Sequence, residues 1–127
     1  MEKQIISTTK APAALGPYSQ AVKVGNLLYT SGQLAINSAT GEFINDDIQK
    51  ATAQSLDNVK AILEEAGTSL DKVVKTLVFL KDMNDFTAMN EVYEKYFSVN
   101  PPARSCVQAG KLPKDALVEI EVIAIVE

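Results

Sequence analysis

Arginine and glutamate side chains in the last quarter of the chain are the strongest candidates for chemistry. Arg104 and Cys106 alternate onto one face of a short segment that has the pattern of a strand. A guanidinium is planar and permanently charged, so Arg104 is suited to grip a carboxylate through two parallel hydrogen bonds. Glu119 and Glu121 share one face of a later apolar segment, where a glutamate could orient a water molecule.

The same residues have simpler interpretations, which the sequence alone leaves open. The few residues between the two segments allow a hairpin, in which Arg104 would form a structural ion pair with Glu119 or Glu121. Cys106 could be a nucleophile activated by the neighbouring guanidinium, or a small half-buried residue that lines a pocket.

Other candidate binding residues lie at the ends or edges of expected elements. Tyr18 follows a Gly-Pro pair at the end of a loop, where its phenol could contact a ligand or simply pack against the protein. Ser31 and Gly32 end an expected strand, and a glycine there lets a ligand approach backbone N–H groups. Asn90 lies beside the apolar stripe of an expected helix, where a solvent-facing side chain is the alternative.

The composition excludes several kinds of site and compartment. The chain has 127 residues, with no histidine and one cysteine. Histidine-dependent triads, HExxH zinc sites and internal disulfides are therefore excluded, and we expect no metal and no organic cofactor. A net charge of −4 argues against nucleic-acid binding. With no signal peptide and no apolar run of about 20 residues, we expect a cytoplasmic protein with one domain over residues 1–127.

The apolar pattern predicts an α+β fold with elements in the order β-ββ-α-β-α-ββ. Gly25 and Asn26, between two apolar runs, predict a two-residue hairpin turn. Helices are expected over residues 46–66, capped by Asn45 or Asp46, and over residues 84–97, capped by Asn84. Strands are expected around Ile5 and Ile6 and over residues 20–24, 27–31, 72–80, 103–108 and 116–126.

Two helices can cover only one face of such a sheet. The expected strands at residues 72–80 and 116–126 carry apolar side chains on both faces. Because a large exposed apolar surface usually marks an interface, we expect a homo-oligomer whose subunits cover the second face. Strict alternation groups the side chains of the earlier strand as Val74, Val78 and Leu80 on one face and Val73, Leu77 and Phe79 on the other.

The chain resembles the Rid/YjgF family of reactive intermediate deaminases, and its RidA branch in particular. The resemblance covers nearly the whole chain and rests on GPYSQAV, YTSGQLA, SLDNVKAILEEAG, KTLVFLKDMNDFTAMNEVYEKYF, PARSC and LPKDALVEIEVIAI, in that order. It implies a chorismate-mutase-like fold, with two helices on one face of a mixed sheet and the other face buried in a homotrimer with pockets between subunits. The implied enzyme is a 2-iminobutanoate/2-iminopropanoate deaminase, a hydrolase without cofactors that converts toxic 2-imino acids and 2-enamines to 2-oxo acids and ammonia.

The resemblance also implies roles for individual residues. Arg104 of PARSC would bind the substrate carboxylate, and Glu119, the first glutamate of EIE, would lie near the attacking water. An imine carbon is already electrophilic, so holding the substrate, placing water and stabilising charge are enough for catalysis. The residues implied to line the pocket are Tyr18, Ser31, Gly32, Asn90 and Cys106.

Two other functions are compatible with the same features. One is an endoribonuclease activity, which is also ascribed to the family and against which the negative charge and the missing histidine count. The other is a non-catalytic trimeric protein that binds small carboxylic acids through Arg104. Turnover of an imine generated in situ would separate an enzyme from such a binding protein.

Overall fold

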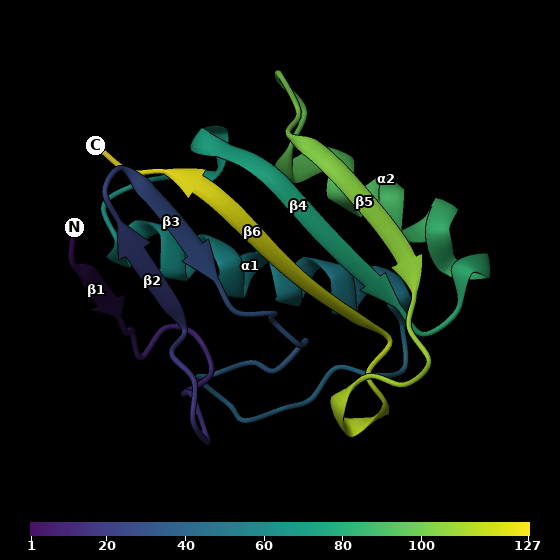
Figure 1. The fold of residues 1–127 in the computed structure, drawn as a ribbon. Helices are drawn as coiled ribbons and strands as arrows, with labels where there is room; N and C mark the ends of the chain where they lie inside the picture. Colours follow the sequence, from purple (N-terminus) through teal and green to yellow (C-terminus); the bar gives the residue numbers. More distant parts are fainter.

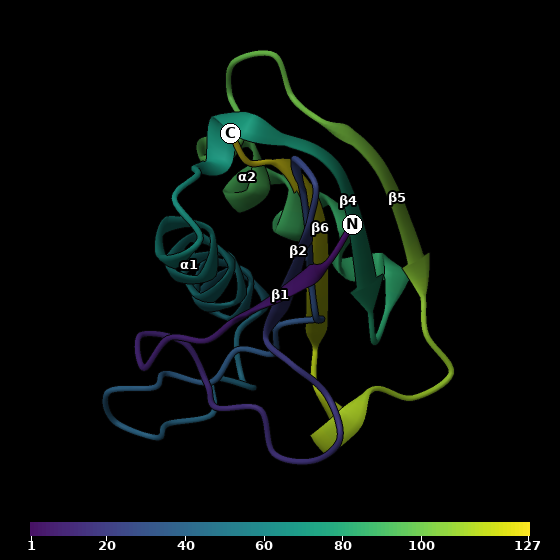
Figure 2. The same ribbon diagram turned by 60° about the vertical axis from the view of Figure 1, so that its left-hand side comes forward.

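A computed structural model describes residues 1–127, and it has an α+β fold as predicted. Six strands form one mixed sheet in the order β1-β2-β3-β6-β4-β5, in which β4 and β5 are parallel and all other neighbours antiparallel. Both helices pack on the same face of the sheet, and no element of the chain covers the other face (Figures 1 and 2). The elements are β1 (Lys3–Ile6), β2 (Ala21–Val24), β3 (Leu27–Thr30), α1 (Ile48–Glu65), β4 (Val73–Leu80), α2 (Phe86–Tyr96), β5 (Ala103–Gln108) and β6 (Val118–Ile125), with short 3-10 turns at Leu70–Lys72, Met83–Asp85 and Pro113–Asp115.

Helix α1 begins two residues later than predicted, and its cap differs from both candidates. The Asp47 carboxylate accepts hydrogen bonds from the backbone N–H groups of Gln49 and Lys50, at 2.9 and 3.0 Å. The prediction of Asn45 or Asp46 as the cap was therefore wrong, and the Asn45 side chain instead binds a distant turn. The helix ends at Glu65.

Helix α2 is preceded by a 3-10 turn that the sequence pattern did not reveal. Asp82 caps this turn by accepting a hydrogen bond from the backbone N–H of Asn84 at 2.9 Å. The prediction of Asn84 as the cap was wrong, because its N–H is the group that is capped. The buried side of α2 carries Met89, Val92 and Tyr93, which pack towards the sheet and α1.

A register shift at the start of β4 changes which side chains share a face. The pairing with β6 is irregular between Val73 and Lys75. As a result Val73 is buried, whereas Val74 is 41% exposed. The grouping of Val74 with Val78 was therefore wrong, since one extra residue in a strand moves the preceding side chains to the opposite face.

Strand β6 shows the alternation that the sequence predicts. Its even-numbered residues are buried between the sheet and the helices, and its odd-numbered residues face away from them and are partly exposed. The outward side chains are Glu119, Glu121, Ile123 and Ile125, so this face is apolar at one end and acidic at the other. Neither helix has the length and apolar character needed to cross a membrane.

Candidate functional site

One group of candidate residues surrounds the Arg104 guanidinium. Strand β5 runs parallel to β4, with Arg104 opposite Thr76 and Cys106 opposite Val78. Since Thr76 and Val78 are buried on the helix side of the sheet, Arg104 and Cys106 also point to that side, towards α2. We call the following residues the guanidinium cluster: Phe86, Asn90, Tyr93, Arg104 and Cys106.

The guanidinium is held in place without a negatively charged partner. Arg104 Nη1 donates a hydrogen bond to Asn90 Oδ1 at 2.7 Å. The guanidinium carbon lies 4.6 Å from the centroid of the Tyr93 ring and 5.3 Å from that of Phe86, within the range of cation–π attraction. The single ion pair within the chain joins Lys81 to Asp115. No carboxylate of this chain therefore neutralises Arg104. Its other N–H groups are therefore available to an anion.

The structure separates Arg104 from both candidate glutamates. Strand β5 is at the edge of the sheet and pairs only with β4, whereas β6 lies on the other side of β4. The hairpin between these two segments, and the ion pair that it would allow, were therefore wrong. Glu119 and Glu121 lie opposite Phe79 and Leu77 on the face that the helices leave uncovered. Arg104 and Glu119 thus belong to opposite faces of the same sheet.

The chemical state of Cys106 argues against a nucleophilic role. Burial raises the pKa of the Cys106 thiol, and the positive charge of Arg104 offsets this only in part. Because the thiolate is the reactive form, a thiol with a raised pKa is a poor nucleophile near neutral pH. The geometry favours the simpler interpretation, in which Cys106 is a half-buried residue beside the guanidinium.

A second group of candidate residues lines a cleft of about 1200 Å³ at one end of the sheet. The loops after β1 and β3 gather there with the turn that precedes β6, at the bottom of Figure 1. Tyr18, Ser31, Gly32 and Glu119 all line this space, which we call the Glu119 cleft. Lys114 and Glu119 are the two charged residues among the 21 that line it.

Gly32 is required by the packing of Glu119 rather than by its own backbone conformation. A Cβ atom at position 32 would overlap the Glu119 carboxylate. Burial raises the pKa of Glu119, and the negative charge of Glu121 raises it further. A carboxylate whose pKa is closer to neutrality is a better proton acceptor than an exposed glutamate.

Gln20 organises one wall of the cleft and was not among the predicted site residues. Its side chain is 3% exposed, accepts a hydrogen bond from the Thr8 N–H at 2.7 Å and donates one to the Pro12 carbonyl at 2.7 Å. The Ser31 hydroxyl donates a hydrogen bond to the Ser19 carbonyl at 2.5 Å. The sequence feature that could have pointed to Gln20 was the position of a glutamine immediately before an apolar strand.

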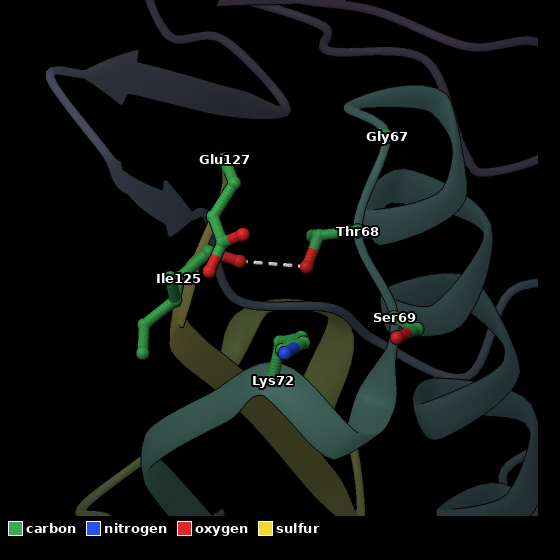
Figure 3. Close-up of a pocket in the computed structure, with 6 residues that line it drawn as sticks. All are labelled: Gly67, Thr68, Ser69, Lys72, Ile125 and Glu127. Carbon is green, nitrogen blue, oxygen red and sulfur yellow. Dashed lines mark hydrogen bonds between the residues drawn. The ribbon is translucent and has the colours of Figure 1, made fainter.

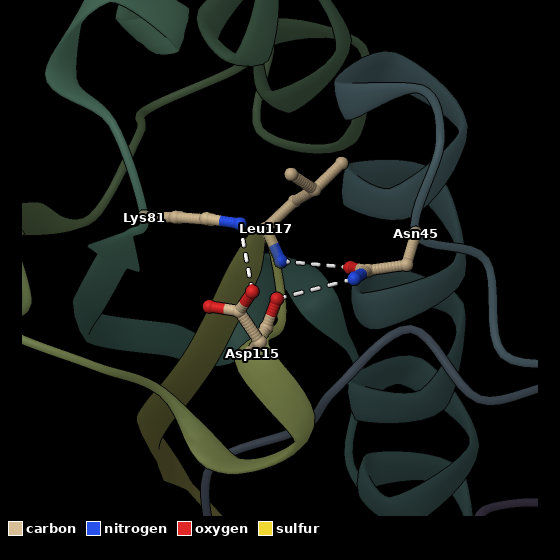
Figure 4. A network of polar contacts seen from close by, with 4 residues as sticks. All are labelled: Asn45, Lys81, Asp115 and Leu117. Carbon is tan, nitrogen blue, oxygen red and sulfur yellow. Dashed lines mark hydrogen bonds and ion pairs between the residues drawn. The ribbon is translucent and has the colours of Figure 1, made fainter.

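The turn before β6 is held by side chains from two other parts of the chain (Figure 4). Lys114 and Asp115 have positive φ angles of 57° and 54°, which are unfavourable for residues other than glycine. Asn45 Nδ2 donates to the Asp115 carbonyl at 3.1 Å, and Asn45 Oδ1 accepts from the Leu117 N–H at 2.9 Å. Lys81 pairs with the Asp115 carboxylate at 2.9 Å. These contacts offset the backbone strain, place Lys114 at the cleft and fix the start of β6.

A smaller hollow of about 250 Å³ lies near the C-terminal end of α1 (Figure 3). The Thr68 hydroxyl donates a hydrogen bond to the Ile125 carbonyl there at 2.6 Å. None of the predicted site residues lines this hollow, and no group of three or more acidic or cysteine side chains in the chain is arranged to hold a metal ion. Its lining residues are Gly67, Thr68, Ser69, Lys72, Ile125 and Glu127.

Sequence comparison gives a family match and full-length relatives. The family model described as endoribonuclease L-PSP matches residues 8–126. A RutC family protein of Pyrococcus abyssi is 54% identical over 124 residues, which are 98% of this chain and 98% of that protein. The 2-iminobutanoate/2-iminopropanoate deaminase of Escherichia coli is 51% identical over 123 residues, 94% of this chain and 95% of that protein.

Solved structures with similar sequences have the same fold. A Yersinia pestis protein of unknown function, described as belonging to the conserved Rid protein family, superposes with a TM-score of 0.96 at 49% identity, covering 98% of this chain and 100% of its own. Escherichia coli TdcF with bound serine gives a TM-score of 0.93 at 46% identity, covering 98% of this chain and 99% of its own.

Proposed function

This chain belongs to the Rid/YjgF family, whose sequence model is described as endoribonuclease L-PSP, and from that premise we propose that it is a 2-imino acid deaminase. Its substrates would be small 2-imino acids and their 2-enamine tautomers, such as 2-iminopropionate and 2-iminobutanoate. The observation that carries the proposal is the state of Arg104, whose guanidinium is oriented by Asn90 and Tyr93 but has no carboxylate partner in the chain. The similar Escherichia coli deaminase supports the choice of reaction.

In the proposed mechanism Arg104 binds the substrate carboxylate through two charge-assisted hydrogen bonds. The Glu119 carboxylate accepts a proton from a water molecule while the water oxygen attacks the C=N carbon. The nitrogen takes up a proton, which gives a tetrahedral carbinolamine with one C–O and one C–N single bond. The hydroxyl proton of this intermediate is then transferred to the nitrogen, the C–N bond breaks with its electron pair on nitrogen as the C=O bond forms, and ammonia leaves a 2-oxo acid.

The separation of Arg104 from Glu119 leads to a proposal about assembly. Because the two residues lie on opposite faces of one sheet, we propose that each site combines the guanidinium cluster of one subunit with the Glu119 cleft of the next. A cyclic homotrimer would form such sites with identical contacts and would cover the face that the helices leave open (Figure 2).

Mixing two inactive variants tests the reaction and the assembly together. We would co-express Arg104→Ala and Glu119→Gln chains and assay the conversion of 2-iminopropionate, generated in situ, to pyruvate. Each variant alone should be nearly inactive. Each mixed trimer should regain one complete site, so an equal mixture should recover about a quarter of the wild-type activity. Sedimentation of the samples should give about three times the 13.7 kDa chain mass.

The outcomes of the mixing experiment have distinct meanings. If each site were built within one chain, the mixture would recover no activity, because every chain in it lacks either the Arg104 guanidinium or the Glu119 carboxylate. A wild-type protein that binds 2-oxo acids but does not convert imines would support the non-catalytic alternative. The bound serine of Escherichia coli TdcF, an amino acid with an α-carboxylate, is compatible with either ligand class.

An endoribonuclease is a second candidate, favoured by the description of the family model. The chain has 12 Lys and Arg against 16 Asp and Glu and no histidine, which counts against a nucleic-acid surface and against histidine-based cleavage. RNA cleavage by a highly purified sample that is lost in Arg104→Ala would support this candidate. Cleavage that survives in Arg104→Ala would have a source other than the proposed site.

A further inference from the structure

Residues 31–36, which we call the Gly32 segment, are held between β6 and helix α1. On the β6 side, the Gln33 N–H donates to the Ile120 carbonyl at 2.8 Å, and the Ile120 N–H donates to the Gln33 carbonyl at 3.2 Å. On the helix side, the Ser55 hydroxyl donates to the same Gln33 carbonyl at 2.7 Å. The segment is therefore fixed from two directions at the residue next to Gly32.

Asn58 extends the attachment one helical turn further along α1. Its Nδ2 donates to the carbonyls of Leu34 and Ile36, at 3.0 and 2.9 Å, and its Oδ1 accepts a hydrogen bond from Gln54 at 2.9 Å. Ser55 is fully buried and Asn58 is 1% exposed. Burying polar groups is costly unless they are hydrogen-bonded, and here the groups that these two side chains donate to are loop carbonyls rather than carbonyls of the helix. The two side chains thus serve the position of the Gly32 segment.

The position of this segment determines the surroundings of Glu119. The Glu119 carboxylate packs so closely on Gly32 that a Cβ atom there would overlap it. We infer that Ser55 and Asn58 of the SLDN sequence are positioning residues, which hold the Gly32 segment against Glu119 and keep water away from one side of its carboxylate. The catalytic part of this inference rests on the proposed deaminase function, whereas the effect on Glu119 itself does not.

The charged groups around Glu119 are independent of this attachment. None of them forms a hydrogen bond with Ser55 or Asn58. A substitution of Ser55 or Asn58 would therefore change the pKa of Glu119 by altering its exposure to water and not by moving a charged group. This makes the titration of Glu119 a direct readout of the position of the segment. These groups are Glu121 on β6, whose negative charge raises the pKa of Glu119, and Lys114 in the turn, which lines the same cleft.

A matched pair of substitutions in α1 tests the inference. Ser55→Ala removes the hydroxyl that holds Gln33. Thr52→Val removes an equally buried hydroxyl one turn earlier, whose hydrogen bond goes to the Ile48 carbonyl of the same helix at 2.7 Å. By NMR titration, the pKa of Glu119 should fall towards its ordinary value in Ser55→Ala and remain unchanged in Thr52→Val.

The kinetics of the same proteins provide the second readout. We expect Ser55→Ala to lower kcat by roughly three- to tenfold with little change in KM, because the Glu119 carboxylate is displaced while the guanidinium cluster is intact. Asn58→Ala, which releases two carbonyls, should lower kcat further, provided that thermal unfolding shows a folded protein.

Equal Glu119 pKa values in Ser55→Ala, Thr52→Val and the wild type would overturn the inference. So would equal shifts in both variants, which would indicate a general loosening of the helix. A wild-type protein without imine turnover would instead refute the proposed function, and the titration would still decide the role of Ser55.

Discussion

The guanidinium cluster and the Glu119 cleft are built in different ways. The cluster lies on two regular elements, where Tyr93 and Phe86 of α2 flank the Arg104 side chain of β5. The cleft is made largely of loops, whose backbones are held by buried side chains such as Gln20 and by hydrogen bonds from α1. The first is positioned by packing of rings and the second by hydrogen bonds to loop carbonyls.

This difference has a chemical consequence. The charge of a guanidinium does not change over the physiological pH range, so the cluster needs only to hold a fixed shape. The charge of Glu119 depends on how much water reaches it, because burial is the main cause of its raised pKa. We therefore expect changes in the cluster to affect substrate binding and changes in the cleft to affect pH dependence. The following substitutions separate these effects.

Substitutions of Arg104 should have the largest effect. Hydrogen bonds to charged groups contribute about 1.5–3 kcal/mol each, so Arg104→Ala should lower kcat/KM by roughly ten- to a thousandfold. Arg104→Lys should be impaired less, since it keeps the charge but loses the forked geometry. Arg104→Ala should lower stability only modestly, because Arg104 makes no ion pair in the chain and the change removes one hydrogen bond to Asn90 and the contacts with two aromatic rings. Assembly and deaminase kinetics would be measured on the same samples, and near-wild-type kcat/KM in a well-assembled Arg104→Ala protein would contradict the assigned role.

Glu119→Gln should lower kcat by roughly a hundredfold, as expected for the loss of a general base. In the wild type, kcat/KM should rise with pH as Glu119 ionises, with a midpoint above the ordinary glutamate pKa of 4.5 because burial raises it. The low-pH limb should disappear in the variant. A residual activity with an unchanged low-pH limb would assign that ionisation to another group.

The same carboxylate should reduce the stability of the folded protein near neutral pH. Its pKa is raised in the folded state, so the folded protein holds the proton more tightly than the unfolded chain does. The resulting loss in the free energy of unfolding is fully present at pH values above the folded-state pKa. It disappears as the pH falls below the unfolded-state pKa. Glu119→Gln should therefore unfold at a higher temperature than the wild type at pH 7, and the difference should vanish near pH 4. Thermal unfolding at both pH values tests this.

Gly32→Ala should have an intermediate effect that is confined to the cleft. The added Cβ would displace the Glu119 carboxylate, and overpacking of this kind typically costs about 1–3 kcal/mol of stability. We expect roughly a tenfold loss of kcat with an unchanged KM, since the added Cβ meets Glu119 and leaves the guanidinium cluster that binds the substrate unaltered. Gly110→Ala is a suitable control, because a Cβ atom there meets no neighbouring atom. Similar losses in both variants would argue against the packing explanation.

Cys106→Ser should have the smallest effect. A half-buried thiol with a raised pKa is a poor nucleophile, so its replacement by a hydroxyl should change kcat/KM by less than about threefold. Mass spectrometry of the protein during turnover should show no covalent adduct on Cys106. A loss of activity as large as that of Arg104→Ala would restore the nucleophile hypothesis.

The sequence by itself determined the elements and the candidate side chains. The order of strands and helices followed from apolar periodicity. The turn between β2 and β3 followed from the preference of two-residue hairpin turns for glycine and asparagine, here Gly25 and Asn26. The absence of histidine excluded whole classes of catalysis before any fold was known. Local patterns could do this because each depends on neighbours only a few residues away.

Only the tertiary structure decided which candidates lie together. Strand pairing placed β4 between β5 and β6, which put Arg104 and Glu119 on opposite faces and excluded their ion pair within one chain. The irregular pairing near Val73 and the attachment of Asn45 to a turn 70 residues away were equally hidden in the sequence. Contacts between segments far apart in the chain depend on the register and packing of the whole sheet, and no local spacing of residues specifies these.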